Sequence, residues 1–220
     1  RALALEFVKQ ERIKLFLISR SEEQLKSLRE VCLRENGDAE ISLFPFDLND
    51  LLMGELPKVL TEKHFNIVIN NAGLLINKAF LELQADEMMQ MMQINFLLPA
   101  LLIRQIAKNG GGEVATHVVN IGSMGGFQGS VKFPGLSVYS ASKAALASLT
   151  ECVAAEWSNK NIFVNCLALG AVQTEMLEEA FPGYKAPLQA DEMARFIADF
   201  ALNGYRFFNG KVLPVSVSTP

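Results

Sequence analysis

The chain alternates between short apolar runs and longer segments in which apolar residues recur at the spacing of a helix face. The apolar runs predict strands at residues 13–19, 41–46, 65–69, 114–121, 162–168 and 211–217. The segments between them predict helices at residues 1–8, from 21 onward, and at 50–63, 85–108, 139–159 and 190–203. Largely apolar strands separated by helices are typical of a parallel sheet that is covered on both faces. The pattern therefore predicts one doubly wound α/β domain over residues 1–220, in which ligands bind beyond the carboxyl ends of the strands.

Composition and charge narrow the class of protein. With 220 residues, half of them apolar, the chain can bury the core of a single domain. Its net charge of −4 is dispersed, so it offers no basic field for nucleic acid or for an anionic membrane. No apolar run approaches the length of a membrane span, and the cytoplasm is the expected location.

The three cysteines, Cys32, Cys152 and Cys166, are an odd number without metal-like spacing. A disulfide framework or a zinc site is not expected from them, and we predict buried, reduced thiols. His64 and His117 have no ligand-like partners nearby in the sequence, so no metal site is predicted.

The most informative segment is 138–144, in which Tyr139 precedes Lys143 by four residues. Residues at this spacing share one face of a helix, where an ammonium beside a phenol lowers the pKa of the phenol. Reduction of a ketone needs a hydride donor on one side of the carbonyl carbon and a proton donor at its oxygen. Tyr139 is the candidate proton donor.

Motifs upstream give this pair a context. The predicted strand at 114–121 runs into Gly122-Ser123, the strand at 65–69 runs into Asn70-Asn71-Ala72-Gly73, and Asn95 lies in the long helical stretch between them. Together these motifs resemble the short-chain dehydrogenase/reductase family, and the resemblance covers essentially the whole chain. It implies a Rossmann-like fold for the predicted domain.

The resemblance also implies a role for each catalytic residue. Ser123 would hydrogen-bond the carbonyl oxygen and hold it against Tyr139. Lys143 would lower the pKa of that phenol and bind the nicotinamide ribose hydroxyls, while Asn95 would hold a water that links Lys143 to solvent. Ser123 and Tyr139 are 139 − 123 = 16 residues apart, a few more than the family pattern. We expect the additional Gly- and Pro-rich length to reshape the rim of the pocket without keeping the two hydroxyls apart.

Two turns resemble the family's contacts to the adenosine half of the cofactor. Asp47 and Leu48 resemble the pair that contacts the adenine, and Asn71, Ala72 and Gly73 resemble the turn on which the adenosine half lies. The glycine lets the backbone approach closely.

Ser19 and Arg20 predict which nicotinamide cofactor is used. They follow the second strand of the family order, where an acid would bind the ribose 2′-hydroxyl of NAD and repel the additional phosphate of NADP. Arg20 instead offers a planar fork for phosphate, so NADP is the predicted cofactor. By the same resemblance, Val172 through its backbone and Thr174 through its hydroxyl would contact the nicotinamide carboxamide. Leu169 stands where the family usually has Pro, which loosens the turn but removes no catalytic group.

The family's first strand and its glycine-rich phosphate loop do not precede residues 1–8, which have the pattern of the middle of an amphipathic helix. Such a loop cradles the pyrophosphate at a helix N-terminus, and its strand belongs in the middle of the sheet. We therefore expect the native polypeptide to carry a strand and a Gly-rich turn ahead of Arg1.

The predicted function is an NADP(H)-dependent oxidoreductase that reduces a carbonyl to an alcohol or catalyses the reverse. Its pocket would be apolar and would suit an aliphatic or aromatic ketone better than a sugar or a charged acid. The residues expected to line or overhang this pocket are Met124, Phe127, Phe133, Met176, Leu177, Phe181 and Tyr184.

Two alternatives stay open. A 3-oxoacyl carrier-protein reductase would need a basic docking patch for its acidic carrier, for which Lys78 and Lys132 are the candidates. A catalytically silent NADP-binding sensor or scaffold would have no need for the complete catalytic set. The apolar faces of the helices at 85–108 and 139–159 resemble those through which family members assemble, so the resemblance implies a homodimer or homotetramer.

Overall fold

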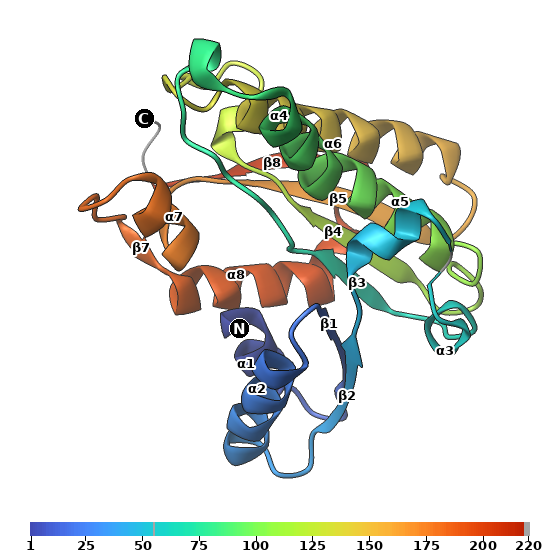
Figure 1. Cartoon of the computed structure of the whole chain (residues 1–220). Coiled ribbons are helices and arrows are strands. Elements are labelled where there is room, and N and C mark those ends of the chain that lie inside the picture. Colours follow the sequence, from blue (N-terminus) through green and yellow to red (C-terminus); the bar gives the residue numbers. More distant parts are fainter. Residues whose placement is uncertain (55, 218–220) are drawn as a thin grey trace.

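A parallel four-stranded sheet forms the centre of the protein. A computed structural model describes residues 1–54 and 56–217, and in it the sheet has the strand order β3-β4-β5-β8 (Figure 1). Its strands are β3 (Ile67–Asn70), β4 (Thr116–Ile121), β5 (Ile162–Leu169) and β8 (Val212–Val215). All of its neighbouring strands are parallel, which confirms the predicted parallel sheet.

Two shorter sheets accompany the central one. Strands β1 (Lys14–Ser19) and β2 (Glu40–Pro45) form a separate parallel pair at the lower side of the view in Figure 1. Strands β6 (Val172–Gln173) and β7 (Leu188–Gln189) form a second pair, which the apolar pattern did not predict because each strand has only two residues. In the described residues, β1–β2 and the central sheet are not joined by ladder hydrogen bonds. The strand expected ahead of Arg1 stays a prediction.

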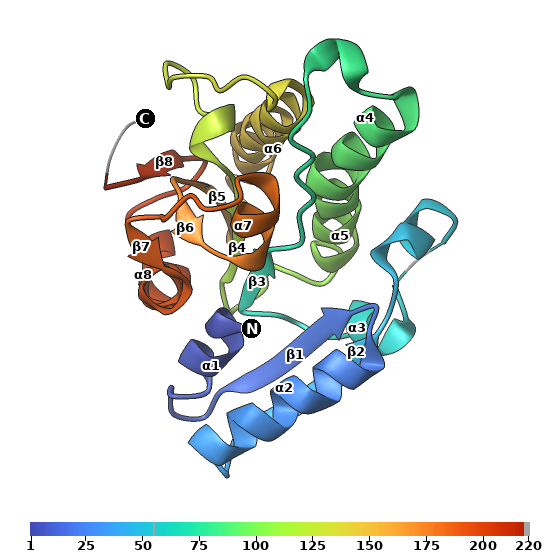
Figure 2. The same cartoon turned by 60° about the vertical axis from the view of Figure 1, so that its left-hand side comes forward.

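Helices connect the strands and cover the sheet on both faces (Figure 2). The α-helices are α1 (Ala2–Phe7), α2 (Glu22–Glu35), α3 (Lys58–Thr61), α4 (Ala85–Met92), α5 (Leu98–Ile106), α6 (Ser137–Glu156), α7 (Glu175–Ala180) and α8 (Ala190–Asn203). Single helical turns are η1 (Leu48–Leu52), η2 (Phe80–Glu82), η3 (Gln93–Leu97), η4 (Met124–Gly126) and η5 (Gly204–Arg206). The predicted cap of α2 is confirmed, since the Ser21 hydroxyl accepts a hydrogen bond from Gln24 N at 3.2 Å.

Alternate residues of the central strands pack into two different cores. Val118 of β4 joins the cluster made with α5 and α6, whereas the next residue, Val119, joins the cluster made with α8 and α1. Both residues are buried, as a parallel sheet covered on two faces requires. The carboxyl ends of these strands are left free to carry polar side chains.

Three predictions differ from the structure. The helix expected at 85–108 is interrupted by η3, a π-turn, between α4 and α5. The segment 50–63 forms only η1 and α3, because Pro57 separates them and starts the second. Cys152 is exposed on the solvent side of α6, while Cys32 and Cys166 are buried as expected.

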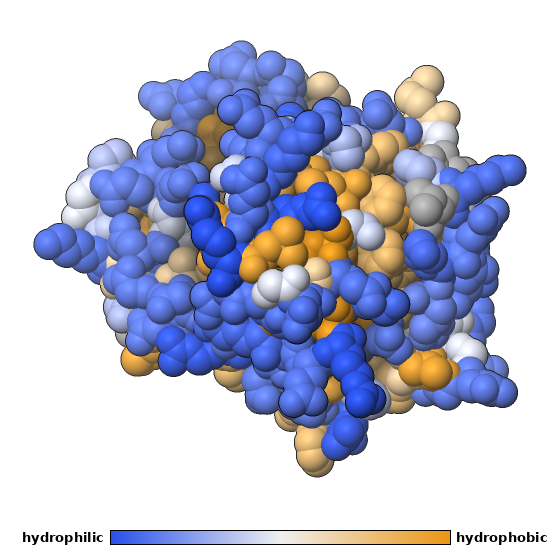
Figure 3. Space-filling view, turned by 90° about the horizontal axis from the view of Figure 1, so that it is seen from below, coloured by the Kyte–Doolittle hydropathy of each residue, from blue (hydrophilic) through white to orange (hydrophobic). Residues whose placement is uncertain are grey.

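Seen from below, the molecule is mostly hydrophilic, with an apolar area near the centre of that face (Figure 3). Within residues 1–54 and 56–217, no helix combines the length and apolarity needed to cross a bilayer. Over the same residues there is no cluster of His, Cys, Asp or Glu suited to a metal ion.

Candidate active site

Ser123 and Tyr139 meet at the carboxyl end of β4. Ser123 follows β4 and caps η4, where its hydroxyl accepts a hydrogen bond from Gly125 N at 3.1 Å. The Tyr139 side chain lies in the first turn of α6, is 9% exposed and is hydrogen-bonded by the Ser123 side chain. Burial raises the pKa of Tyr139, and the hydrogen bond from Ser123 opposes this rise. The two hydroxyls therefore converge despite the 16-residue separation.

Lys143 lies one helical turn after Tyr139 and is 5% exposed. Its Nζ is 6.0 Å from the centroid of the Tyr139 ring and donates a hydrogen bond to the Ile121 carbonyl at 2.9 Å. Burial lowers the pKa of Lys143 to about 8. The expected lowering of the phenol pKa by this ammonium is wrong for this structure, because desolvation of Tyr139 is the dominant influence.

Asn95 lies in the π-turn and is completely buried. Its amide oxygen accepts a hydrogen bond from Leu74 N at 2.8 Å, and its Nδ2 donates to Leu74 O at 2.8 Å and to Ser142 Oγ at 2.9 Å. Ser142 in turn donates to the Tyr139 carbonyl at 2.7 Å. Asn95 thus ties the chain after β3 to the helix that carries Tyr139, and π-turns often occur at functional sites.

A close backbone contact joins η4 to α6. A Cβ built at Gly126 would lie 2.6 Å from Ala144 N and 2.8 Å from Lys143 Cβ. Only glycine allows the turn after Ser123 to approach the helix backbone to this extent. The contact brings Ser123 alongside the Tyr139 face of α6.

A buried polar chain supports the site and was not assigned from the sequence. Asn70 Nδ2 donates to Asn120 Oδ1 at 2.7 Å, and Asn120 Nδ2 donates to Thr150 Oγ1 at 2.9 Å. Thr150 donates to the Leu146 carbonyl at 2.9 Å within α6. Two asparagines near the ends of adjacent apolar strands were the available signal, since buried amides need partners.

The turn at Gly73 lies close to the candidate catalytic side chains. A Cβ built at Gly73 would be 3.4 Å from Asn95 Oδ1, 3.6 Å from Lys143 Nζ and 3.7 Å from Met176 Cε. The neighbouring residues Asn71 and Ala72 are exposed. Because Gly73 has no side chain, a nicotinamide cofactor could approach its backbone closely.

The remaining predicted cofactor residues lie at strand ends. Ser19 and Arg20, together with Ser21 and Gln24, line a hollow of about 440 Å³ beyond β1. Asp47 follows β2, but its carboxylate caps η1 by accepting from Asn49 N at 2.9 Å.

Leu48 and Val172 pack against the two cores of the central sheet, which leaves their backbones as the groups to contact a ligand. Thr174 is the N-cap of α7, where its hydroxyl accepts from Leu177 N at 3.2 Å.

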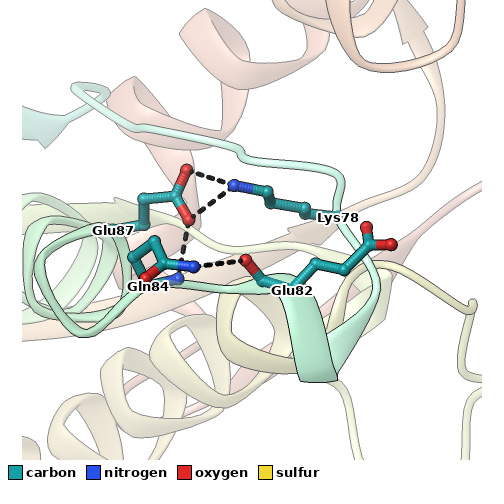
Figure 4. Close-up of polar contacts among 4 residues, drawn as sticks. All are labelled: Lys78, Glu82, Gln84 and Glu87. Carbon is teal, nitrogen blue, oxygen red and sulfur yellow. Dashed lines mark hydrogen bonds and ion pairs between the residues drawn. The ribbon is translucent and has the colours of Figure 1, made fainter.

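The strap, which we define as residues 74–82, leads from β3 to α4 along the site. Its Lys78 Nζ makes an ion pair with Glu87 at 3.0 Å, and Glu87 also accepts from Gln84 N at 2.8 Å at the start of α4 (Figure 4). The Lys78 backbone N–H donates to Gly135 O at 3.1 Å. The strap is therefore attached both to α4 and to the loop before α6.

An apolar hollow of about 550 Å³ opens beside the strap. Its lining residues are Asn77, Ala79, Phe80, Phe133, Pro134, Gly135 and Ser137. Of the predicted pocket residues, Phe133 lines this hollow, Phe181 packs against the cluster that contains Tyr139, and Tyr184 is exposed. Met124, the first residue of η4, is buried.

Comparison with known proteins identifies this arrangement. The model of the short chain dehydrogenase family matches residues 1–185. The chain belongs to this family, whose members are oxidoreductases that use a nicotinamide cofactor. The predicted fold and family are confirmed.

Individual curated relatives share about a quarter to a third of their residues with the matched part of this chain. The 3-oxoacyl-[acyl-carrier-protein] reductase FabG of Chlamydia trachomatis is 26% identical over 200 residues, 83% of this chain and 78% of the relative. The 2-dehydro-3-deoxy-D-gluconate 5-dehydrogenase of Escherichia coli strain K12 is 33% identical over 134 residues, 59% of this chain and 47% of the relative.

Solved structures agree on the fold. A 4-hydroxyisoleucine dehydrogenase mutant complexed with NADH and succinate superposes with a TM-score of 0.81 at 22% identity, over 99% of this chain and 92% of the other. ElxO with NADP bound superposes with a TM-score of 0.80 at 23% identity, over 98% and 91% of the two chains.

Proposed function

We propose that the protein is an NADP(H)-dependent oxidoreductase that reduces the carbonyl of an apolar ketone or aldehyde, or oxidises the matching alcohol. The observation that carries the proposal is the buried Tyr139 hydroxyl, which is hydrogen-bonded by Ser123 and lies one helical turn from Lys143. A phenol with a raised pKa holds its proton at neutral pH and can donate it to a developing alkoxide. Ser123 would hydrogen-bond the same oxygen and orient it.

The cofactor would supply the hydride when bound. Gly73, beside Lys143, has no side chain, so the cofactor could approach its backbone closely, and the Lys143 ammonium is a donor for ribose hydroxyls. Ser19 and Arg20 border the hollow beyond β1, where the guanidinium would bind the 2′-phosphate. The solved neighbours include complexes with NADH and complexes with NADP or NADPH, so the preference for NADP rests on Arg20.

The carrier-protein alternative draws support from the 26% identical FabG relative. Against it, both candidate docking lysines have internal partners. Lys78 pairs with Glu87, and Lys132 Nζ donates to Gly125 O at 2.8 Å and to Phe127 O at 2.7 Å. A small apolar carbonyl compound is therefore the favoured substrate.

Assembly as a homodimer or homotetramer is part of the proposal. Met89 of α4 and Leu97 of the π-turn are exposed apolar side chains. Both lie in the helical segment 85–108, which the family resemblance implies forms a subunit contact. Burial of such side chains between subunits would be favourable.

Substitution of Tyr139 by Phe tests the function. The change removes only the hydroxyl, so NADPH binding should persist while turnover of a ketone panel falls by about 10²–10⁴-fold, the range for a general acid. Steady-state assays and fluorescence titration with NADPH measure the two quantities. Tyr205→Phe, at a tyrosine that packs against His117 away from the site, is the matched control. Near-normal turnover of the Tyr139 variant would mean that another group donates the proton.

A further inference from the structure

Asn77 lies where three segments around the site meet. It belongs to the strap, and the strap follows β3 past α7 toward α4 (Figure 2). The other two segments are the loop between η4 and α6, represented by Gly135, and the end of α7, represented by Ala180. One short side chain contacts both of them.

The contacts on the two sides of Asn77 are different. Its Nδ2 donates a hydrogen bond to the Ala180 carbonyl at 2.8 Å, across 103 residues of sequence. Its Oδ1 lies over Gly135, where an added Cβ would collide with it. Gly135 has φ of 84°, a left-handed conformation that other residues rarely adopt. The loop is thus shaped to leave room for the Asn77 amide.

Helix α7 covers the candidate site. The Met176 methyl group lies 3.7 Å from the position that a Cβ would occupy at Gly73, close to Lys143 Nζ. Phe181 packs against the apolar cluster that contains Tyr139. In the described part of the chain, the other side-chain hydrogen bonds made by residues 174–183 stay within residues 173–183. The bond from Asn77 is therefore a tie between this cover and the rest of the site.

We propose that Asn77 is a positioning residue that holds α7 closed over the substrate and so sets how tightly the substrate is enclosed. The inference rests on the proposed function, because α7 covers the same pocket that Tyr139 serves. The strap itself is held independently of α7, by Lys78 to Glu87 and to Gly135. Loss of the Asn77 amide should release α7 and leave the strap in place.

Amide hydrogen exchange of the ligand-free protein tests the tie without reference to activity. Asn77→Asp keeps the size of the side chain but removes the N–H donor to Ala180. Asn77→Ala removes both the donor and the amide oxygen. Both variants should speed exchange in peptides covering 174–184 by about fivefold, as expected for one lost hydrogen bond, and leave the β5 peptide 162–169 unchanged. Lys78→Met removes the ion pair to Glu87 and is the control that should leave α7 exchange unchanged.

Kinetics separate enclosure from chemistry. The Asn77→Asp variant should raise KM for the ketone by about fivefold and leave kcat and its pH profile unchanged. The reason is that, among the described residues, Asn77 is hydrogen-bonded to Ala180 and Lys143 to Ile121, and neither Tyr139 nor Lys143 is hydrogen-bonded to Asn77. Wild-type exchange in α7 of the Asn77→Asp variant would overturn the proposal, as would an equal loosening by Lys78→Met. If the unaltered protein turned over no ketone, the proposed function would fail while the exchange result would still decide the tie.

Discussion

The two larger sheets of this protein are parallel, yet they are built differently. In the central sheet, five of six residues of β4 and six of eight residues of β5 are buried, whereas no residue of β1 or β2 is fully buried. The candidate catalytic residue Ser123 follows β4 of the buried sheet, and the candidate NADP-phosphate residues Ser19 and Arg20 lie at and after the end of the partly exposed β1. Chemistry that needs fixed geometry and low dielectric is thus associated with the rigid sheet, and an exposed phosphate site with the looser one.

The polar groups of the two sheets follow the same division. Asn70, Asn120 and Asn165 are buried in the central sheet and are hydrogen-bonded. On the small sheet, Lys14 and Glu40 form an ion pair at 2.9 Å with side chains that are 65% and 66% exposed. Solvent screens such a pair, so it stabilises the fold little.

Leucine-to-alanine substitutions in the two sheets should give the largest difference, measured as the loss of unfolding free energy. Leu167 of β5 is fully buried, and its replacement by Ala should lower the free energy of unfolding by about 2–5 kcal/mol. Leu17 of β1 is only partly buried, and the same change there should lower it by less than about 2 kcal/mol. Urea denaturation measures both values. Equal losses would mean that the small sheet is as well packed as the central one.

His117 should give the central sheet a pH dependence. Its Nδ1 contacts the Ala201 carbonyl at 2.9 Å and therefore carries the proton, while Nε2 accepts from Asn165 Nδ2 at 3.1 Å. Burial lowers the pKa of His117 in the folded state, so below the unfolded value of about 6.5 the unfolded chain takes up a proton that the folded chain does not. The contribution of His117 to the free energy of unfolding is therefore fully present above that pH. Below it, the free energy of unfolding falls by at most about 1.4 kcal/mol per pH unit.

Thermal and urea unfolding between pH 7 and pH 5 would measure this slope. His117→Gln should flatten it, although the variant will be less stable at every pH because the buried pair is broken. If the His117 variant kept the same slope of stability against pH, the pH dependence would have to come from other titratable groups.

Substitution of Arg20, which follows β1 of the small sheet, should give the smallest effect, a change in cofactor affinity. Arg20→Ala should weaken NADPH binding by about tenfold, the scale of an exposed charge-assisted contact, and should leave NADH binding nearly unchanged. Isothermal titration with both cofactors measures the difference. Arg29→Ala, an exposed arginine further along α2, is the matched control. Equal affinities of the unaltered protein for NADPH and NADH would contradict the predicted preference.

Much of the fold follows from local periodicity. Strands β1–β5 and β8 and most helices were predicted within a few residues, because alternation of apolar runs and helical faces is a property of adjacent residues. The two-residue strands β6 and β7 and the short helix α7 between them were not predicted. The π-turn was not predicted either, since Gln93–Leu97 continues the helical spacing on both sides. Its cause is tertiary: Asn95 bonds both backbone groups of Leu74.

The site divides in the same way. Convergence of Ser123, Tyr139 and Lys143 followed from motif spacing, whereas the direction of the Tyr139 pKa was wrong because it depends on burial. The exposure of Cys152 depends on how α6 packs. The Asn77 contact to Ala180 joins residues 103 positions apart, which no local pattern can indicate.

The contact at Gly126 has a consequence for how this site tolerates change. Because the backbone of η4 rests directly against the backbone of α6 at Lys143 and Ala144, the separation of Ser123 and Tyr139 depends on covalent geometry and atomic radii rather than on side-chain rotamers. Residues 127–136 leave from one side of this contact and return at the other. Ahead of Gly135, which contacts the strap at Asn77 and Lys78, the loop can therefore change in length or composition while Ser123 and Tyr139 keep their separation. Substrate range could diversify in this way.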